Sequence, residues 1–251
     1  ILKLSRIFVA NHIGVRKSFS EFRCKVFDFD TVFTRGRLSF ALSGNRIGCK
    51  LCAVSLKKVC KTNIKGNRRS RITYYIYSDL IVVVTQDSSQ DSLKQLLEAS
   101  VKITNQILNL DWGVSGSIAK GKLVFDKHNQ IFLGQPVVDA YLAQEDVEFY
   151  GIVICDSAVD DVKKYLSDVK SKRITKHLVN LLKEERLHFK TGYYSQYHLC
   201  WFKYFYNEKG PTHPYYIRNT TDEHVKQKLE VMFQNTKGKA RRYIENTIEL
   251  L

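Results

Sequence analysis

The sequence predicts an α+β protein that ends in a helical extension. Short runs of β-branched and aromatic residues, separated by glycines, are typical of strands between residues 72 and 156. Amphipathic runs with a period near 3.6 residues, which indicate helices, lie among these strands and dominate the chain after residue 156. With 251 residues and 44% hydrophobic content, the chain is long enough to bury a core of this kind.

The centre of the predicted sheet is a hairpin over residues 72–85, which read ITYYIYSDLIVVVT. Two strand-forming runs lie on either side of Ser78 and Asp79, and this spacing is typical of a tight turn. The hairpin therefore carries an acidic residue at its tip.

An amphipathic helix follows, with Asp91 and Ser92 as its expected start and its end near Leu110. Its apolar face holds Leu93, Leu96, Leu97, Val101, Ile103, Ile107 and Leu108.

The next segment alternates between strands and glycine turns. Val114–Leu123 predicts a strand in which glycines allow another backbone to come close. Gln130–Leu133 predicts a second hairpin arm that leads through Gly134 into a helix over Pro136–Gln144, since proline is favourable in a first helical turn. The apolar run Tyr150–Cys155 predicts a buried strand.

Two strands are expected near the N-terminus, over Arg6–Gly14 and Lys25–Thr34. The C-terminal part predicts helices over residues 162–170, 174–187, 222–234 and 239–251. Between them lies a stretch rich in Tyr, Trp and Phe, residues 193–206, which is expected to pack in the core or in a dimer contact rather than stack on bases. The expected division is a domain over residues 1–165 followed by a helical C-terminal extension over residues 166–251.

No apolar run reaches the roughly 20 residues that span a bilayer, and the N-terminus does not have the layout of a secretory signal. We therefore expect a cytoplasmic protein, with room for a short leader because the sequence begins at Ile1 without Met. The six cysteines are expected to be reduced thiols. Cys49, Cys52 and Cys60 lack the fourth ligand of a structural zinc site.

The positive charge is concentrated at the N-terminus. Residues 1–71 hold 17 Lys and Arg against 3 Asp and Glu, a net +14 out of the chain's +15. The densest part, Lys57–Arg71, predicts an exposed loop. It is either a solvated loop or a surface that attracts a triphosphate, pyrophosphate or nucleic acid. Stacking aromatics are not interleaved with these cations, which disfavours nucleic acid.

Four segments together carry a resemblance to a known family. YSDLIVVVT, VSGSIAKGKLVFDKHNQIFLGQPVVDAYLAQE, YGIVICDSA and the closing RRYIENTIELL resemble the catalytic domain of class III nucleotidyl cyclases. They are most similar to the bacterial pyrimidine (uridylate and cytidylate) cyclases of antiphage defence. The resemblance is good over about residues 72–156, looser after it and poor before it.

This resemblance implies a ferredoxin-like (βαββαβ) palm with helices on one face. It also implies a homodimer that converts a nucleoside triphosphate, with a pyrimidine favoured, into a 3′,5′-cyclic mononucleotide and pyrophosphate. Cyclisation of this kind uses two divalent ions, Mg²⁺ or Mn²⁺, held by carboxylates.

The resemblance implies Asp79 as the best metal ligand. The family's first-strand Asp aligns with Asn11, and the alternative first strand supplies Asp30 instead, so both remain candidates for catalysis and metal binding. Arg69, Arg71, Lys120 and Gly134 form the expected substrate-binding set.

Three positions depart from the purine cyclases. The family's base-selecting Asp falls at Ile131, and its helix Asn and Arg fall at Val138 and Leu142. The sequence therefore leaves two alternatives to a pyrimidine cyclase: a catalytically silent cyclase-like module that binds a nucleotide or partner, and a basic nucleic-acid-binding protein.

Overall fold

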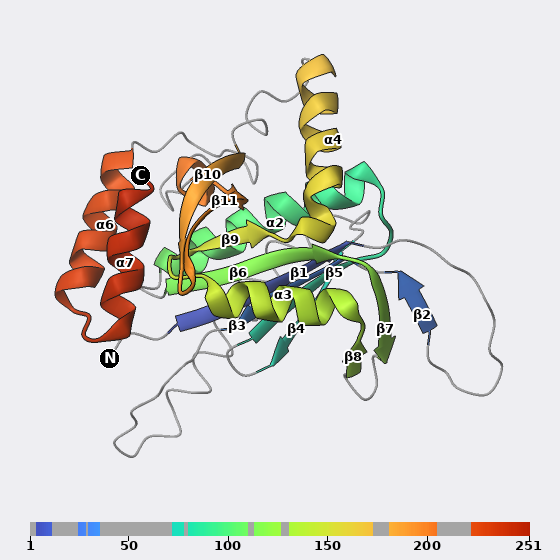
Figure 1. The fold of residues 1–251 in the computed structure, drawn as a ribbon, viewed down its shortest axis with the longest axis horizontal. Coiled ribbons are helices and arrows are strands. Elements are labelled where there is room, and N and C mark those ends of the chain that lie inside the picture. Colours follow the sequence, from blue (N-terminus) through green and yellow to red (C-terminus); the bar gives the residue numbers. More distant parts are fainter. Residues whose placement is uncertain are drawn as a thin grey trace, which may run out of the picture.

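A sheet of eight strands forms the centre of the molecule, and three shorter strands form a second sheet (Figure 1). The structure is a computed structural model that describes residues 4–11, 25–28, 30–35, 72–77, 80–109, 113–126, 131–172, 181–204 and 222–251. These residues build an α+β protein, as the sequence predicts.

The strands are β1 (Leu4–Asn11), β2 (Lys25–Asp28), β3 (Asp30–Arg35), β4 (Ile72–Tyr77), β5 (Leu80–Thr85), β6 (Gly113–Lys120), β7 (Lys122–Asp126), β8 (Ile131–Leu133), β9 (Gly151–Ile154), β10 (Leu182–Phe189) and β11 (Gly192–Leu199). The helices are α2 (Gln90–Asn109), α3 (Gln135–Asp146), α4 (Asp156–Lys172), α6 (Asp222–Gln234) and α7 (Lys239–Glu249), with a 3₁₀ turn, η1, over Trp201–Tyr204.

The large sheet is mixed in direction. Its order is β10-β11-β9-β6-β1-β3-β5-β4, with an additional pairing between β1 and β5. β6 runs parallel to both β1 and β9, whereas the β4–β5 and β10–β11 pairs are antiparallel hairpins. The carboxyl ends of β1, β6 and β9 therefore meet at one edge of the sheet.

β6 is buried on both faces, because small residues let a helix approach each side. Val114 and Ile118 belong to the same apolar cluster as the buried residues of α2. On the other face the Ser117 hydroxyl donates to the Ala140 carbonyl of α3 at 2.5 Å, and Gln144 of α3 donates to Ser115 at 3.3 Å.

The expectation of helices on one face is therefore wrong. α2 and α3 cover opposite faces of the sheet, and Figure 1 shows α3 in front of the strands with α2 behind them. The reason lies in the alternation along β6, where polar Ser115 and Ser117 still find hydrogen-bond partners under α3. A strand enclosed in this way need not have a solvent-facing side.

Most predicted elements are confirmed with small shifts in their ends. The 72–85 hairpin forms, with pairing that runs from Ile72↔Thr85 to Tyr77↔Leu80. The expected helix over residues 91–110 is α2, whose first turn is held by Asp87, the acceptor of bonds from the Ser89 N–H and the Ser92 hydroxyl. The predicted 114–123 strand divides at Gly121 into β6 and β7, which join different sheets.

The predicted helix over residues 174–187 is wrong in its second half. Residues 182–189 form β10, which pairs along its whole length with β11, from Leu182↔Leu199 to Phe189↔Gly192. The leucine spacing is compatible with a helix, but pairing in a hairpin that joins the large sheet overrides so short a local pattern. β11 joins β9 through His198↔Val153, so the described part of the expected extension contributes two strands to the large sheet as well as the helices α6 and α7. Position 165/166 falls inside α4, whose end also belongs to that extension.

The C-terminal helices are anchored on a short segment before β9. The Tyr150 N–H donates to the Thr247 hydroxyl, and the Asn246 amide donates to the Glu148 carbonyl, both at 2.8 Å. The Tyr150 ring also packs so close to Gly113 that a Cβ there would lie 2.0 Å from it. These contacts join α7 to the β6–β9 region.

A search over the described helices finds none that combines the length and the apolar character required to cross a membrane.

Candidate functional site

Three of the expected site residues lie in one row across the sheet. Asn11, the last residue of β1, is the register partner of Asp30 in β3 on one side and of Lys120 in β6 on the other. Directly opposed residues in neighbouring strands lie about 5 Å apart. We call Asp30, Asn11 and Lys120 the edge row.

Lys120 is held from two directions by α4. Its backbone N–H donates to the Ser157 hydroxyl at 3.1 Å, and its ammonium forms an ion pair with Asp161. Ser157 and Asp161 are four residues apart and therefore share a face of the helix. Both charged side chains are only 20% exposed, so this cation lies partly shielded at the edge of the sheet.

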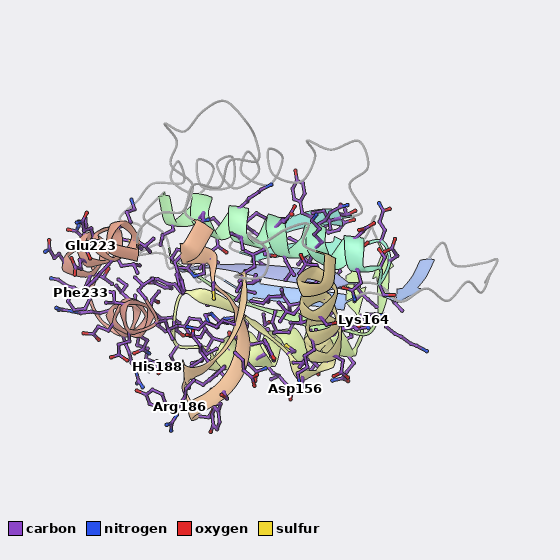
Figure 2. All side chains as sticks on the ribbon, turned by 90° about the horizontal axis from the view of Figure 1, so that it is seen from above. Asp156, Lys164, Arg186, His188, Glu223 and Phe233 are labelled. Atoms are coloured by element: carbon purple, nitrogen blue, oxygen red, sulfur yellow. The ribbon has the colours of Figure 1, made fainter. Side chains whose placement is uncertain are left out.

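The turn from β9 into α4 completes this edge. The Cys155 N–H donates to the Ile118 carbonyl at 2.7 Å, and the Gln196 amide of β11 donates to the Ile154 carbonyl. Asp156 begins α4, and Lys164 lies two turns further along it (Figure 2). In sheets with parallel strands, ligands commonly bind outside the carboxyl ends, which is where the edge row lies.

Cys155 is not suited to act as a nucleophile at this edge. Burial raises the pKa of its thiol far above the ordinary value, and the nearby carboxylates of Asp139 and Asp156 raise it further. A thiol that remains protonated is a weak nucleophile and a weak metal ligand.

The pair Tyr77↔Leu80, which flanks the turn of the β4–β5 hairpin, lies at the opposite end of the sheet from the edge row. Leu80, the residue after Asp79, is the register partner of Arg6 in β1 and of Arg35 in β3. Each of these positions is five residues from the edge row, or about 16 Å along a strand. Asp79 itself lies outside the described residues, as do the basic-loop residues Arg69 and Arg71. The described strands thus do not bring the edge row next to Leu80.

Gly134 has a structural reason to be glycine. It precedes α3 with a φ of 156°, and a Cβ there would lie 2.2 Å from the Lys122 carbonyl oxygen. The close passage of β7 beneath the turn therefore requires the missing side chain. No role in substrate binding is needed to explain this residue.

The helix that follows exposes apolar side chains. Val138 and Leu142, at the positions where the resemblance aligns an Asn and an Arg, are 49% and 60% exposed, and Leu133 of β8 is 61% exposed. Val138 and Leu142 are four residues apart and therefore share a face of α3. Ile131 begins β8.

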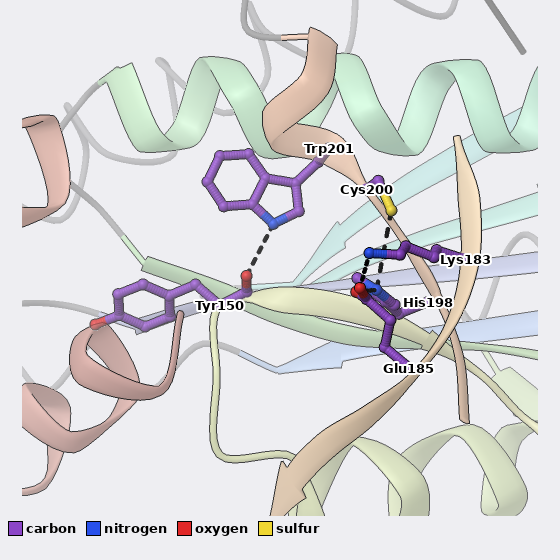
Figure 3. Close-up of polar contacts among 6 residues, drawn as sticks. All are labelled: Tyr150, Lys183, Glu185, His198, Cys200 and Trp201. Carbon is purple, nitrogen blue, oxygen red and sulfur yellow. Dashed lines mark hydrogen bonds and ion pairs between the residues drawn. The ribbon is translucent and has the colours of Figure 1, made fainter. Parts of the chain in front are cut away.

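A second polar cluster lies in the β10–β11 hairpin (Figure 3). The buried His198 ring meets Glu185 at 2.8 Å through Nε2, and Glu185 also pairs with Lys183. The Cys200 thiol contacts the same Nε2 at 3.9 Å. A nucleophile, base and acid triad uses both ring nitrogens of its histidine, so this arrangement holds the hairpin together rather than activating Cys200.

The aromatic stretch that contains this cluster packs as expected. Trp201 and Phe202 are buried, and the Trp201 indole donates to the Tyr150 carbonyl at 2.8 Å (Figure 3). Tyr193 and Tyr194 are the exceptions in the hairpin, since each is about half exposed. The core prediction is therefore confirmed for Trp201 and Phe202.

Sequence reasoning missed two functional candidates, Ser157 and Asp161. Their only signal is the spacing of four residues after a predicted buried strand, and that spacing is common on solvated helix faces. The partner, Lys120, is 41 residues away from Asp161 in sequence. Only the packing of α4 against the end of β6 reveals the pair.

No cluster of three or more His, Cys, Asp or Glu side chains suited to a metal ion occurs within the described ranges. No protein-family model, curated protein or solved structure gives a significant match to the chain.

Proposed function

We propose that the protein is a nucleotidyl cyclase that binds a nucleoside triphosphate, with a pyrimidine favoured, at the carboxyl edge of β1, β6 and β9. The observation that supports this most is the edge row. It aligns a carboxylate residue, an amide residue and a cation in register across three strands. The sequence alone offers Asn11 and Asp30 as alternatives, whereas their register makes them neighbours.

The residue types in the row suit a divalent cation and a phosphate. Asp30 and Asn11 would hold Mg²⁺ or Mn²⁺, since both residue types supply the oxygen donors that these hard ions prefer. When bound, the ion would polarise the phosphate and favour ionisation of the attacking hydroxyl. Lys120 would bind a phosphate oxygen as a cation.

In the proposed reaction the ribose 3′-oxygen forms a bond to the α-phosphorus, and the bond from that phosphorus to the bridging oxygen breaks. Pyrophosphate leaves with the bonding electron pair, and the hydroxyl proton passes to solvent. The proposal also includes a ferredoxin-like arrangement and a preference for pyrimidine bases, both of which are inferred from the family resemblance.

A homodimer follows from the same proposal. The family builds its sites between two such domains, and the exposed side chains of Val138 and Leu142 supply apolar surface on α3 for this contact. Action in the cytoplasm, in antiphage signalling, is the expected setting.

A catalytically silent nucleotide-binding module is the second candidate. One observation favours it: Leu80, next to Asp79 in sequence, pairs about 16 Å from the edge row, at about 3.3 Å per residue. If Asp79 is not close to Asp30 and Asn11, the edge row has a single carboxylate residue, which is too few to hold two ions.

The deciding experiment measures binding and product together. The purified protein is titrated with UTP, CTP, ATP and GTP in the presence of Mn²⁺, and the reaction mixtures are then analysed for cyclic nucleotides. The cyclase proposal expects binding and a cyclic pyrimidine product, both lost in Asp30→Ala. If Asp79 shares the metal site, as the family resemblance implies, Asp79→Ala should abolish product and leave the fold intact.

Other outcomes separate the two candidates. Binding without product in all four reactions identifies the silent module. Product formation that survives Asp79→Ala would leave the edge row as the whole metal site. Absence of triphosphate binding contradicts both, and tight, length-dependent retention of DNA or RNA would instead favour a nucleic-acid-binding protein.

A further inference from the structure

We propose that the Asp161 carboxylate, through its ion pair with Lys120, competes with phosphate for the Lys120 ammonium until a phosphate displaces it. This inference rests on the proposed function, because it assigns a regulatory role to a neighbour of the same edge row. It identifies α4 as the element that sets how strongly this edge attracts an anion.

The first step is the charge of the pair. The ammonium of Lys120 and the carboxylate of Asp161 are in direct contact, and each side chain is 20% exposed. Together they present no net charge to an approaching anion. Partial burial reduces screening by water and salt. The Asp161 carboxylate therefore attracts the ammonium and repels an anion more strongly than an exposed carboxylate would.

The second step is that the backbone of Lys120 has its own support. Its N–H donates to the Ser157 hydroxyl at 3.1 Å, and β6 pairs with β1 up to Lys120 itself and with β9 up to Ile118. Removing the Asp161 charge therefore leaves the lysine at the edge of the sheet. The ammonium has three donors, so the cation that is released can bind phosphate oxygens directly.

The third step is the direction of the effect. A triphosphate that reaches Lys120 meets a carboxylate at close range, and like charges repel. Replacing Asp161 with a neutral residue removes this repulsion and the competition for the ammonium. Even with the screening of bulk water, two unit charges about 5 Å apart interact by the equivalent of about a fourfold change in affinity, so about fourfold is the lower limit at this partly buried position.

The test uses inorganic triphosphate as the probe, with EDTA present so that metal binding does not contribute. Isothermal titration calorimetry compares wild type, Asp161→Asn and the matched control Asp160→Asn. Asp160 is the exposed neighbour of Asp161 on α4, and its replacement changes the net charge equally. We expect at least about fourfold tighter binding for Asp161→Asn and a change below about twofold for Asp160→Asn.

Lys120→Gln provides the second arm. It should weaken binding, and Asp161→Asn should give a much smaller gain in the Lys120→Gln background than in wild type, because the two residues act as a pair. Circular dichroism checks that each variant is folded, and Asp161→Ser replaces Asp161→Asn if that variant is not.

The outcomes also separate this inference from the function. If wild type binds UTP with Mn²⁺ but Asp161→Asn binds inorganic triphosphate no better than Asp160→Asn does, the competing role is wrong and the proposed function stands. If Asp161→Asn tightens triphosphate binding and wild type forms no UTP complex, the competing role stands and the function is wrong. If neither inorganic triphosphate with EDTA nor UTP with Mn²⁺ binds to wild type or to any variant, both the competing role and the proposed function are wrong.

Discussion

Asn11 and Asp30 are register partners at the junction of β1 and β3, although the sequence offers them as rival positions for a single metal ligand. Nineteen positions separate them along the chain, and no local pattern predicts that they face each other in the sheet. Their pairing makes the combination of an amide and a carboxylate, rather than either residue alone, the feature to test.

Asp30→Asn should weaken the binding of Mn²⁺ with UTP by about tenfold or more, because it removes the only carboxylate of the edge row. Titration calorimetry with Mn²⁺ and UTP measures this. Asp28→Asn is the matched control, since Asp28 ends β2 in the other sheet, as the register partner of Lys122. An equal loss in both variants would mean that net charge, not the edge row, governs binding.

Neutralising the basic loop should act through charge. Replacing Lys57, Lys58, Arg68, Arg69 and Arg71 together with Gln should weaken triphosphate binding and flatten its salt dependence. These residues lie outside the described ranges, so the expectation comes from their sequence alone. A triphosphate should give a shallow salt slope, whereas a duplex gives roughly −0.9 per phosphate contacted. A steep slope with retention of duplex at about 0.15 M salt would contradict the cyclase proposal.

Gly134→Ala should destabilise the fold by more than Gly238→Ala. A Cβ at Gly134 would lie 2.2 Å from the Lys122 carbonyl oxygen, whereas one at Gly238 has nothing within 4 Å and meets only backbone strain at a φ of 71°. We expect a loss of about 2–4 kcal/mol for the first and about 1 kcal/mol for the second. Urea unfolding measures the free energy of unfolding of both variants. Similar losses would mean that the backbone at residue 134 moves away from the Lys122 carbonyl at little cost.

The stability of the protein should fall as the pH rises above about 8.5, partly because of Cys155. Its pKa is raised in the folded state by burial, so the unfolded chain loses this proton first. The contribution of Cys155 is therefore complete below the unfolded pKa and decreases by up to about 1.4 kcal/mol per pH unit above it. Urea unfolding between pH 7.5 and 10 should show a flatter decline in Cys155→Ala. An unchanged slope would mean that the thiol ionises in the folded protein.

Local signals predicted the elements whose formation depends on near neighbours. The period of α2, the run of β-branched residues in β5 and Pro136 at the start of α3 each act within a few residues. The misassignment of β10 has a different cause. Its leucines fit a helix, whereas pairing with β11 across a tight turn, and the pairing of β11 with the distant strand β9, make the strand favourable.

The site divides in the same way. Lys120 and Gly134 could be selected because both belong to the segment that resembles the cyclase family. Asp161 could not, since its importance arises from a contact with Lys120 that depends on how α4 packs after β9. The two-sided covering of β6 was also hidden, because serines in a strand suggest a solvent-facing side until their hydrogen-bond partners are known.

The contacts around Tyr150 have a consequence for how the protein is made. The Tyr150 N–H and the Glu148 carbonyl receive their partners from residues 97 and 98 positions later in the chain. While the ribosome is still synthesising that stretch, these polar backbone groups and the Tyr150 ring have no α7 to cover them. The region around β9 therefore completes these contacts only after Thr247 has been synthesised and has left the ribosome.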